Sequence, residues 1–331
     1  VPRTRARMPA DTQFASVEIG MNHPGEIAPL SEMVRPHVAM ITTVAPAHME
    51  AFESLDGIAR EKADIVAGLM PAGAAILPAD VPTIDILVQA ALAKGATIVG
   101  FGETADAFRL TALEMHHDVT VIQAPLRGAP AVLRLNTLGR HFAVNAMGVL
   151  AAVEALSGDP TRAAVDLFRW HPPAGRGRRE TVSLDPADTN AYFELIDDAY
   201  NANPASVAAA LEVLAASDRQ EQTRQGPRRI AILGDMLELG QEEAQIHAQL
   251  AGNNHLLTLD VVHCVGPRMR ACYDALPAAI RGRWVQEAQE LASGLGELIA
   301  PGDRVLVKGS LGSKVSLIVD LIRNLGHRSQ P

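Results

Sequence analysis

The second half of the chain alternates between short apolar runs and longer segments in which apolar residues recur every three or four positions. The short runs predict buried strands, and the longer segments predict amphipathic helices. We expect strands over 192–197, 229–234, 260–265, 283–285 and 303–308, and helices over 204–217, 241–252, 267–276, 287–299 and 313–325. Strands separated by helices of this length are typical of a mostly parallel sheet that is covered on both faces.

The first half has the same alternation, with one interruption. We expect strands over 14–20, 38–44, 74–77 and 97–101, and helices over 27–34, 55–69, 81–94, 143–156 and 161–168. Between residues 109 and 135 the helical period disappears, which predicts a β-hairpin region. Proline and glycine cluster over 171–178 and mark a break. Because 331 residues exceed what one hydrophobic core usually serves, we predict two domains, 1–172 and 173–331.

Residues 195–204, Leu-Ile-Asp-Asp-Ala-Tyr-Asn-Ala-Asn-Pro, place two carboxylates at the end of a predicted buried strand. Ligands of parallel sheets bind at the carboxyl ends of strands, so Asp197 and Asp198 are candidates for chemistry. An ordinary turn between strand and helix explains the same residues, because one carboxylate can accept backbone N–H groups there. Both interpretations stay open on this stretch alone.

Glu18 and His48 follow two predicted strands and could meet at one sheet edge. A carboxylate and a neutral imidazole suit Mg²⁺ only if further oxygen ligands are present. Lys62 supplies one if CO₂ converts its amine to a carbamate. A loop histidine, a strand-end glutamate and a lysine that extends to solvent would give the same pattern without a metal.

Two further strand ends carry polar residues: Asp235 follows the strand over 229–234, and Lys308-Gly-Ser310 follows the strand over 303–308. Small residues after a strand, with a cation at the edge, can bind a carboxylate or a phosphate. Glycine and serine are also common where strands simply end, so this pattern is open as well.

Charge and composition narrow the class of partner. The formal net charge of −9 argues against a surface for nucleic acid or for an anionic membrane. Two cysteines, Cys264 and Cys272, cannot form a disulfide framework, which fits a reducing cytosol. No apolar run approaches the length of a membrane span. We therefore expect a cytoplasmic protein that binds no nucleic acid and does not insert into membranes. We also expect it to be a monomer.

Taken together, these stretches resemble the Mur ligase family over nearly the whole chain. The matching stretches are Glu18-Ile-Gly, Pro24-Gly-Glu-Ile27, Ala47-His-Met-Glu50, Lys62, Gly139-Arg-His141 with Asn145, Gly175-Arg176, Ile196-Asp-Asp-Ala-Tyr-Asn-Ala-Asn-Pro204, Gly234-Asp-Met-Leu-Glu-Leu-Gly240 and Lys308-Gly-Ser310. Each match is weak alone, and their common order makes the resemblance specific.

The resemblance implies an α/β fold with a central P-loop-type ATPase domain and a Rossmann-like C-terminal domain that has a mostly parallel sheet. It also implies ATP-dependent peptide bond formation in peptidoglycan precursor synthesis. ATP phosphorylates the terminal carboxylate of UDP-N-acetylmuramoyl-tripeptide, and the amine of D-alanyl-D-alanine attacks the acyl phosphate. The implied cofactors are ATP and Mg²⁺, which offsets charge on the transferring phosphoryl group.

Site residues follow from the resemblance by position. Glu18 and His48 match Mg²⁺ ligands, and Lys62 matches a lysine that is carbamylated in the family. The remaining matches are His141 and Asn145 on the adenine side, Arg176 and Asp198 at the phosphates and ribose, and Tyr200, Asn201, Asn203, Asp235, Lys308 and Ser310 on the dipeptide side.

One departure matters most: the family's phosphate loop, which ends in Gly-Lys-Thr or Gly-Lys-Ser, does not occur in these residues. The chain begins at Val1 without an initiator Met, so we expect the loop and the uridine-binding domain to lie upstream. The ATPase domain would then be incomplete, and this polypeptide would be inactive alone. Phe142 and Leu311 also differ from the residues usual in the family and leave individual contacts open.

Two alternatives remain. One is a non-catalytic remnant that binds a nucleotide or a dipeptide, and the other is a sister ligase that acts on another amino acid or on folate. A Gly-Lys-Thr loop encoded in frame upstream would favour the enzyme over the remnant, whereas the Tyr200–Asn203 stretch argues against the sister ligases.

Overall fold

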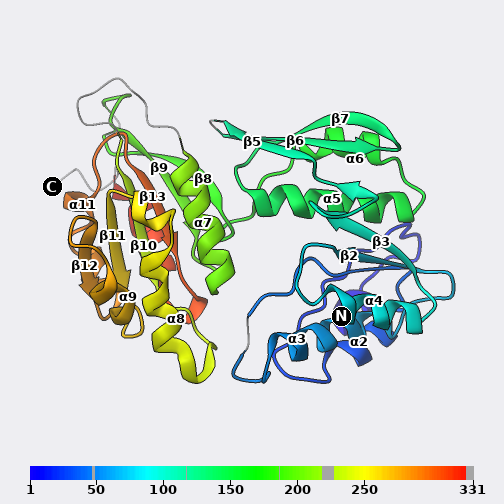
Figure 1. The fold of residues 1–331 in the computed structure, drawn as a ribbon. Helices are drawn as coiled ribbons and strands as arrows, with labels where there is room; N and C mark the ends of the chain where they lie inside the picture. Colours follow the sequence, from blue (N-terminus) through cyan, green and yellow to red (C-terminus); the bar gives the residue numbers. More distant parts are fainter. Residues whose placement is uncertain (47–48, 117, 186, 218–226, 326–331) are drawn as a thin grey trace. The chain divides into compact units, whose positions relative to one another are not determined.

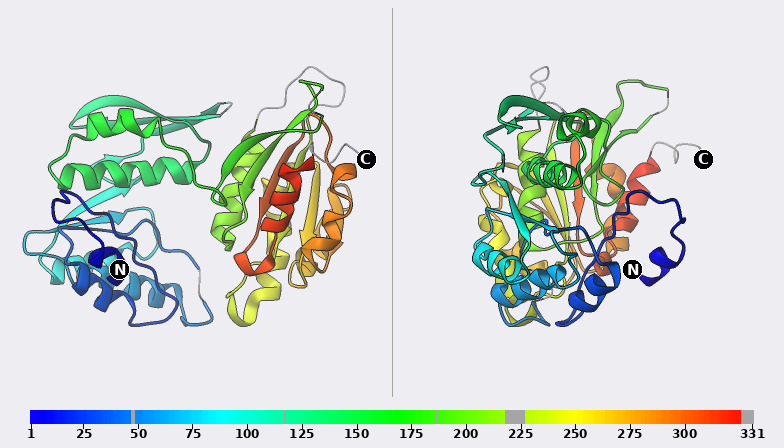
Figure 2. Two further views of the ribbon diagram at one scale, coloured as in Figure 1. Left: turned by 180° about the vertical axis from the view of Figure 1, so that it is seen from behind. Right: turned by 90° about the vertical axis from the view of Figure 1, so that its right-hand side faces the viewer.

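The computed structural model describes residues 1–46, 49–116, 118–185, 187–217 and 227–325. Two compact units make up the chain. Unit 1 comprises residues 1–114, 119–136 and 140–170, and unit 2 comprises 115–118, 137–139 and 171–331. Figures 1 and 2 show the ribbon of each unit, coloured along the sequence. Both units have an α/β fold whose main sheet is mostly parallel, as the sequence predicts.

The N-terminal half contains two sheets among its described residues, with strand orders β1-β2-β3-β4 and β5-β6-β7. Its elements are α1 (Pro2–Ala6), α2 (Ile27–Val34), β1 (Val38–Met40), α3 (Leu55–Ala63), the 3-10 helix η1 (Asp64–Val66), β2 (Ala74–Pro78), α4 (Ile84–Ala93), β3 (Thr97–Gly102), β4 (Phe108–Arg109), β5 (Ala112–His116), β6 (Val119–Leu126), β7 (Ala129–Leu135), α5 (Arg140–Ala155) and α6 (Pro160–Leu167). The four-stranded sheet is parallel, and β6 and β7 form an antiparallel hairpin.

Side chains of β2 alternate between two cores, which explains why this strand is apolar at every position. Ala75 and Leu77 pack with α3 and α4, and Ile76 packs with α5 and the β6–β7 hairpin. Successive residues of a strand point to opposite faces, so a strand that is covered on both faces needs apolar residues throughout.

The C-terminal half is built around a six-stranded sheet with the order β12-β11-β10-β13-β9-β8. Its elements are β8 (Arg178–Ser183), β9 (Tyr192–Asp198), α7 (Pro204–Ala216), β10 (Arg229–Gly234), η2 (Gly240–Glu242), α8 (Glu243–Gln249), η3 (Leu250–Gly252), η4 (Leu256–Thr258), β11 (Val261–Val265), α9 (Arg270–Ala275), β12 (Arg281–Val285), α10 (Ala288–Ala292), α11 (Leu295–Leu298), β13 (Arg304–Lys308), η5 (Leu311–Ser313) and α12 (Ser316–Arg323). Every strand pair is parallel except β8–β9.

Helices cover both faces of this sheet (Figures 1 and 2). On one face, Leu233 and Leu306 pack in a core with residues of α7 and α9. On the other, Ile232 and Val307 pack with residues of α10 and α12. Because β9, β10, β11 and β13 are parallel, their carboxyl ends lie along one edge of this covered sheet, where ligands of such sheets bind.

Some expectations were wrong. Residues 14–20 form neither strand nor helix, and Phe14 is 71% exposed. Only residues 17 and 19 of this run are even partly buried, so the run lacks the buried face that an alternating strand needs. The strand expected over 38–44 ends at Met40. The edge strand β8 was missed, because its sequence is polar and buries only Val182.

Several helices are shorter than their apolar period suggests. The helix expected over 55–69 gives way to a 3-10 turn after Ala63. That expected over 241–252 is divided into η2, α8 and η3, and that expected over 287–299 is divided into α10 and α11. Gly294 lies between α10 and α11, and glycine is a residue type that weakens helices.

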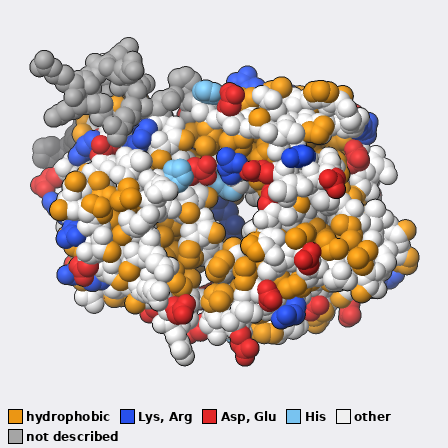
Figure 3. All heavy atoms as spheres, in the orientation of Figure 1, with side chains coloured by type: hydrophobic (Ala, Val, Ile, Leu, Met, Phe, Trp, Pro, Cys, Tyr) orange, Lys and Arg blue, Asp and Glu red, His pale blue; other side chains and the backbone are white. Residues whose placement is uncertain are grey.

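No helix in the described ranges combines the length and apolarity that crossing a membrane requires. Acidic and basic side chains are interspersed on the face shown in Figure 3.

The turn that contains Gly68 packs closely against the backbone of α2, and this packing depends on the glycine. A Cβ built on Gly68 would lie 2.0 Å from the carbonyl oxygen of Ser31 in α2. Ser31 is fully buried, and its hydroxyl accepts a hydrogen bond from Gly68 N at 3.1 Å and donates to the carbonyl of Ile65. A side chain at position 68 would therefore force α2 away from this turn.

We expect Gly68→Ala to lower the free energy of unfolding by about 1–3 kcal/mol, because overpacked sites must shift backbone. Chemical denaturation measures this. Gly20→Ala is the matched control, since a Cβ at Gly20 meets nothing within 4 Å. Equal stability of the two variants would contradict the role given to Gly68.

Candidate functional site

Candidate residues of unit 2 gather at the carboxyl edge of its sheet because β9 and β13 pair in parallel. The register places Asp198 opposite Lys308 and Asp197 opposite Val307. Adjacent strand residues point to opposite faces, so the two aspartates have different surroundings.

Asp198 forms an ion pair with Lys308. Lys308 Nζ donates to Asp198 Oδ2 at 2.7 Å and to the carbonyl oxygen of Asn201 at 2.9 Å. The lysine is 2% exposed, so its charge depends on these partners. Burial raises the pKa of Asp198, and the charge of Lys308 opposes that shift. The pair fixes a carboxylate and an ammonium group side by side at the strand end.

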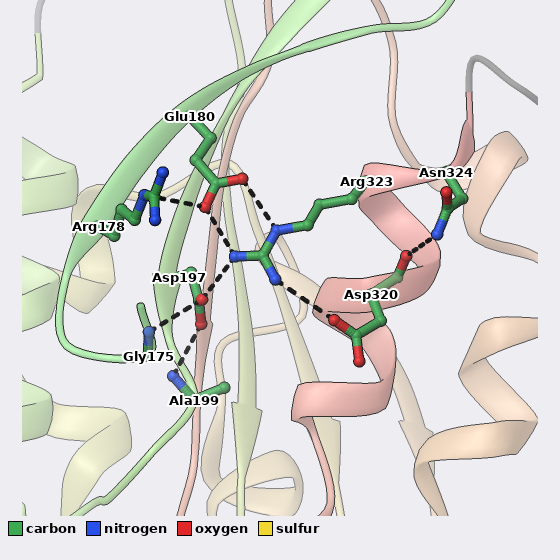
Figure 4. A network of polar contacts seen from close by, with 8 residues as sticks. All are labelled: Gly175, Arg178, Glu180, Asp197, Ala199, Asp320, Arg323 and Asn324. Carbon is green, nitrogen blue, oxygen red and sulfur yellow. Dashed lines mark hydrogen bonds and ion pairs between the residues drawn. The ribbon is translucent and has the colours of Figure 1, made fainter. Parts of the chain in front are cut away.

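Asp197 has structural partners (Figure 4). Its Oδ2 accepts hydrogen bonds from Gly175 N at 2.9 Å and from Arg323 Nη2 at 2.8 Å, and Oδ1 accepts from Ala199 N at 3.4 Å. The family resemblance gave Asp198 rather than Asp197 to the nucleotide, but the strand-end pattern alone left open which aspartate is ordinary turn chemistry. The contacts assign that part to Asp197.

Arg176 lies over the ring of Tyr200, with its guanidinium carbon 4.5 Å from the ring centroid. Tyr200 is 47% exposed. The backbone joins the same two turns, since Tyr200 N donates to Gly175 O at 3.1 Å. The arginine and the tyrosine of the predicted site are thus neighbours.

Other candidates hold the fold as well as lining this edge. Asn203 is the N-cap of α7: its side-chain oxygen accepts from Ser206 N at 2.8 Å, and Ser206 Oγ accepts from Asn203 N. Ser310 is buried, accepts from Leu237 N at 3.0 Å and donates to Ala202 O at 3.3 Å. Asn201 is exposed and contributes its carbonyl oxygen to Lys308.

Asp235 is buried at the end of β10. Its Oδ1 accepts from Met269 N at 2.8 Å, and Arg268 Nη1 lies 3.8 Å from Oδ2. Burial raises the pKa of Asp235. Arg268 also donates to Glu243 at 2.6 Å and lines an open pocket of about 560 Å³ between α8 and α9. Asp235 therefore supports one wall of the pocket.

Sequence reasoning missed His247, a buried histidine of α8. Its Nε2 accepts from Met236 N at 3.0 Å, and Nδ1 lies 2.6 Å from the carbonyl oxygen of Glu243. Because a carbonyl only accepts, Nδ1 carries the proton and the ring is neutral. Nothing in a single histidine on a helix signals this bond to a loop eleven residues earlier.

In unit 1, Lys62 lies in the last turn of α3 and is half-buried. Burial lowers its pKa, which favours the neutral amine. The neighbouring Glu61, which the sequence did not single out, accepts from Gly25 N at 2.6 Å and Ile27 N at 2.9 Å. Glu61 thus fixes the loop before α2.

The predicted set of metal ligands lies partly outside the described residues. Glu18 is exposed, and His48 lies outside the described residues. Across the described ranges, no group of three or more histidine, cysteine, aspartate or glutamate residues could hold a metal ion. The Mg²⁺ assignment stays a prediction.

His141 and Asn145 occupy the first two turns of α5, and both are half-buried. Their spacing of four places them on one face of the helix. The His141 ring contacts Phe142, whose ring meets Trp170 edge-on at 5.3 Å.

The chain is similar to known proteins along both units. Residues 1–153 match the Mur ligase middle domain, and residues 177–311 match the Mur ligase glutamate ligase domain. UDP-N-acetylmuramoyl-tripeptide–D-alanyl-D-alanine ligase of Rickettsia prowazekii is 30% identical over 95% of this chain and 67% of its own length. The Escherichia coli protein of the same name is 31% identical over 98% of this chain and 69% of its own.

A solved structure agrees with the sequence comparison. The crystal structure I of MurF from Acinetobacter baumannii superposes with a TM-score of 0.83 at 29% identity, and the match covers 97% of this chain and 67% of that one. Sequence and fold point to the same group of enzymes, and this chain is a member of the Mur ligase family.

Proposed function

We propose that this protein is the ligase that joins D-alanyl-D-alanine to UDP-N-acetylmuramoyl-tripeptide at the expense of ATP. The observation that carries the proposal is the Asp198–Lys308 pair at the carboxyl edge of the sheet, 2.7 Å apart and next to the Arg176–Tyr200 stack. The similarity to ligases of that name supports the choice of substrates.

The reaction has two steps. An oxygen of the tripeptide carboxylate attacks the γ-phosphorus of ATP, and ADP leaves. The amine of D-alanyl-D-alanine then attacks the acyl carbon, phosphate leaves, and the nitrogen loses a proton as the amide forms. The acyl phosphate turns a poor leaving group into a good one, and cations must offset the charge on the transferring group.

Unit 2 would supply part of that charge. Lys308 has three N–H donors, and Asp198 and Asn201 accept two of them, so one remains for a phosphate or a carboxylate. Asp198 pairs through Oδ2, and its other oxygen can accept a ribose hydroxyl. Arg176 would meet the phosphates.

The dipeptide side is the less direct part of the proposal. Ser310 and Asp235 are already bonded to backbone groups, so we assign them to shaping this side together with the Asn203 cap. Tyr200 and Asn201 are exposed and would contact the substrate.

In unit 1, His141 and Asn145 would contact adenine. Glu18, His48 and a carbamate on Lys62 would provide oxygen and imidazole ligands of the kind that Mg²⁺ accepts. The lowered pKa of Lys62 suits this modification, because CO₂ reacts with the neutral amine. When bound, Mg²⁺ neutralises phosphate oxygens.

The function is tested with the full-length gene product. We expect phosphate release that requires ATP, UDP-N-acetylmuramoyl-tripeptide and D-alanyl-D-alanine together. Turnover with a single amino acid or with a folate in place of the dipeptide would favour a sister ligase. Nucleotide binding without turnover would favour a non-catalytic protein.

The 331-residue polypeptide alone should release no phosphate in that assay, because its sequence contains no Gly-Lys-Thr or Gly-Lys-Ser phosphate loop. Steady release that depends on both substrates would contradict this.

Carbamylation of Lys62 has a direct readout. In protein equilibrated with ¹³C-bicarbonate, we expect a carbamate resonance that disappears in Lys62→Ala and persists in the control Lys94→Ala. Lys62→Ala should also lower kcat by roughly 10²-fold or more, as loss of a charge-stabilising group does. Formate should restore part of it. An unmodified amine at alkaline pH with bicarbonate would overturn the proposal.

A further inference from the structure

Arg323, near the C-terminal end of α12, lies at the centre of a charged network (Figure 4). Its Nε and Nη2 donate to the two oxygens of Glu180 at 2.9 and 2.7 Å. Nη2 also donates to Asp197 at 2.8 Å, and Nη1 reaches Asp320 at 3.3 Å. The bidentate contact with Glu180 fixes the plane of the guanidinium and so directs Nη2 at Asp197.

Asp197 carries this restraint to the segment around Arg176. Its Oδ2 accepts from Gly175 N at 2.9 Å, and its carbonyl oxygen accepts from Gly177 N at 2.8 Å. The Asp197 side chain is only 5% exposed, so water does little to stabilise its charge, and Arg323 is the cation that pairs with it.

The segment needs such a restraint. Gly175 and Gly177 flank Arg176 and have φ angles of +76° and +85°, which glycine adopts without strain. Backbone of this kind is freely adaptable, so hydrogen bonds rather than side-chain sterics decide where Arg176 points. The two bonds to Asp197 and the bond from Tyr200 N to Gly175 O hold both sides of the arginine.

We propose that Arg323 is a positioning residue for the ligase reaction: through Glu180 and Asp197 it holds the Gly175–Gly177 segment so that Arg176 meets the nucleotide phosphates. The inference rests on the proposed function for the part given to Arg176. Arg323 itself does not touch substrate. Without it, Asp197 would lose the cation that pairs with it, Glu180 would keep, of its described ion pairs, only the 3.5 Å contact with Arg178, and the bond from Asp197 to Gly175 would loosen.

The test compares Arg323→Met with Asp320→Asn in the full-length gene product. Arg323→Met keeps the apolar stem and removes the charge, whereas Asp320→Asn removes only the charge of a third partner and leaves Glu180 and Asp197 paired with Arg323. We expect Arg323→Met to raise KM for ATP by roughly tenfold, since small misplacements of a binding group cost up to about a hundredfold. The KM values for the other substrates should not change, and Asp320→Asn should behave as the parent.

A purely structural role predicts otherwise. Partial unfolding would lower kcat by reducing the active fraction and leave every KM unchanged. Arg323→Lys, which keeps the charge, should recover part of the ATP KM. The double variant Arg323→Met with Asp197→Asn should do the same, because an amide oxygen still accepts from Gly175 and no charge is left unpaired. These two variants keep the test decisive if Arg323→Met folds poorly.

Hydrogen exchange gives a second, independent readout. The Gly175 amide should exchange faster in Arg323→Met than in Asp320→Asn, and an unchanged rate would overturn the proposal. Arg176→Met tests the role of Arg176 in ATP binding separately from the role of Arg323 in positioning it. If it raises KM for ATP and Arg323→Met does not, the inference is wrong. If Arg176→Met has no effect, the part given to Arg176 in the proposed function is wrong, and the inference fails with it.

Discussion

Two adjacent carboxylates at the end of β9, one buried and one half-buried, each require a cation, and this constraint organises unit 2. A buried charge without a partner is strongly unfavourable, and neighbouring strand residues face opposite sides of a sheet. One partner must therefore come from each side. Lys308, next in the sheet on β13, pairs with Asp198, and Arg323 on α12 pairs with Asp197. The place of β13 next to β9 brings Lys308 to Asp198, and the packing of α12 on the sheet brings Arg323 to Asp197.

The periodic part of the fold could be predicted from the sequence. Strands covered on both faces, such as β2, β10 and β13, are apolar at successive positions and were placed within a residue or so. Expectations were wrong where the pattern was right but the partner was missing. Residues 14–20 alternate in part, yet they pair with no described strand. Conversely, β8 is polar and is a strand only because β9 offers it an edge.

The candidate site could be located from strand ends, but strand ends do not distinguish residues that are free to bind substrate from residues that hold the fold. Strand ends reveal Asp197, Asp198, Asp235 and Lys308 because the topology of parallel sheets brings such ends together. They do not reveal that Asp235 and Ser310 bind backbone or that Asn203 caps a helix. Arg323 and His247 gave no sequence signal, since their partners come from other elements: Arg323 lies 143 residues from Glu180 and 126 from Asp197. Only the folded chain brings such charges together.

These neighbouring aspartates have different functions. The most direct measurement compares Asp197→Asn and Asp198→Asn in the full-length gene product by ligation kinetics and by chemical denaturation. We predict that Asp198→Asn has the larger effect on kcat/KM for ATP, while Asp197→Asn has the larger effect on stability, because of the two aspartates only Asp197 links the Gly175 turn to α12. The reverse order, or equal effects of both variants on both quantities, would contradict it.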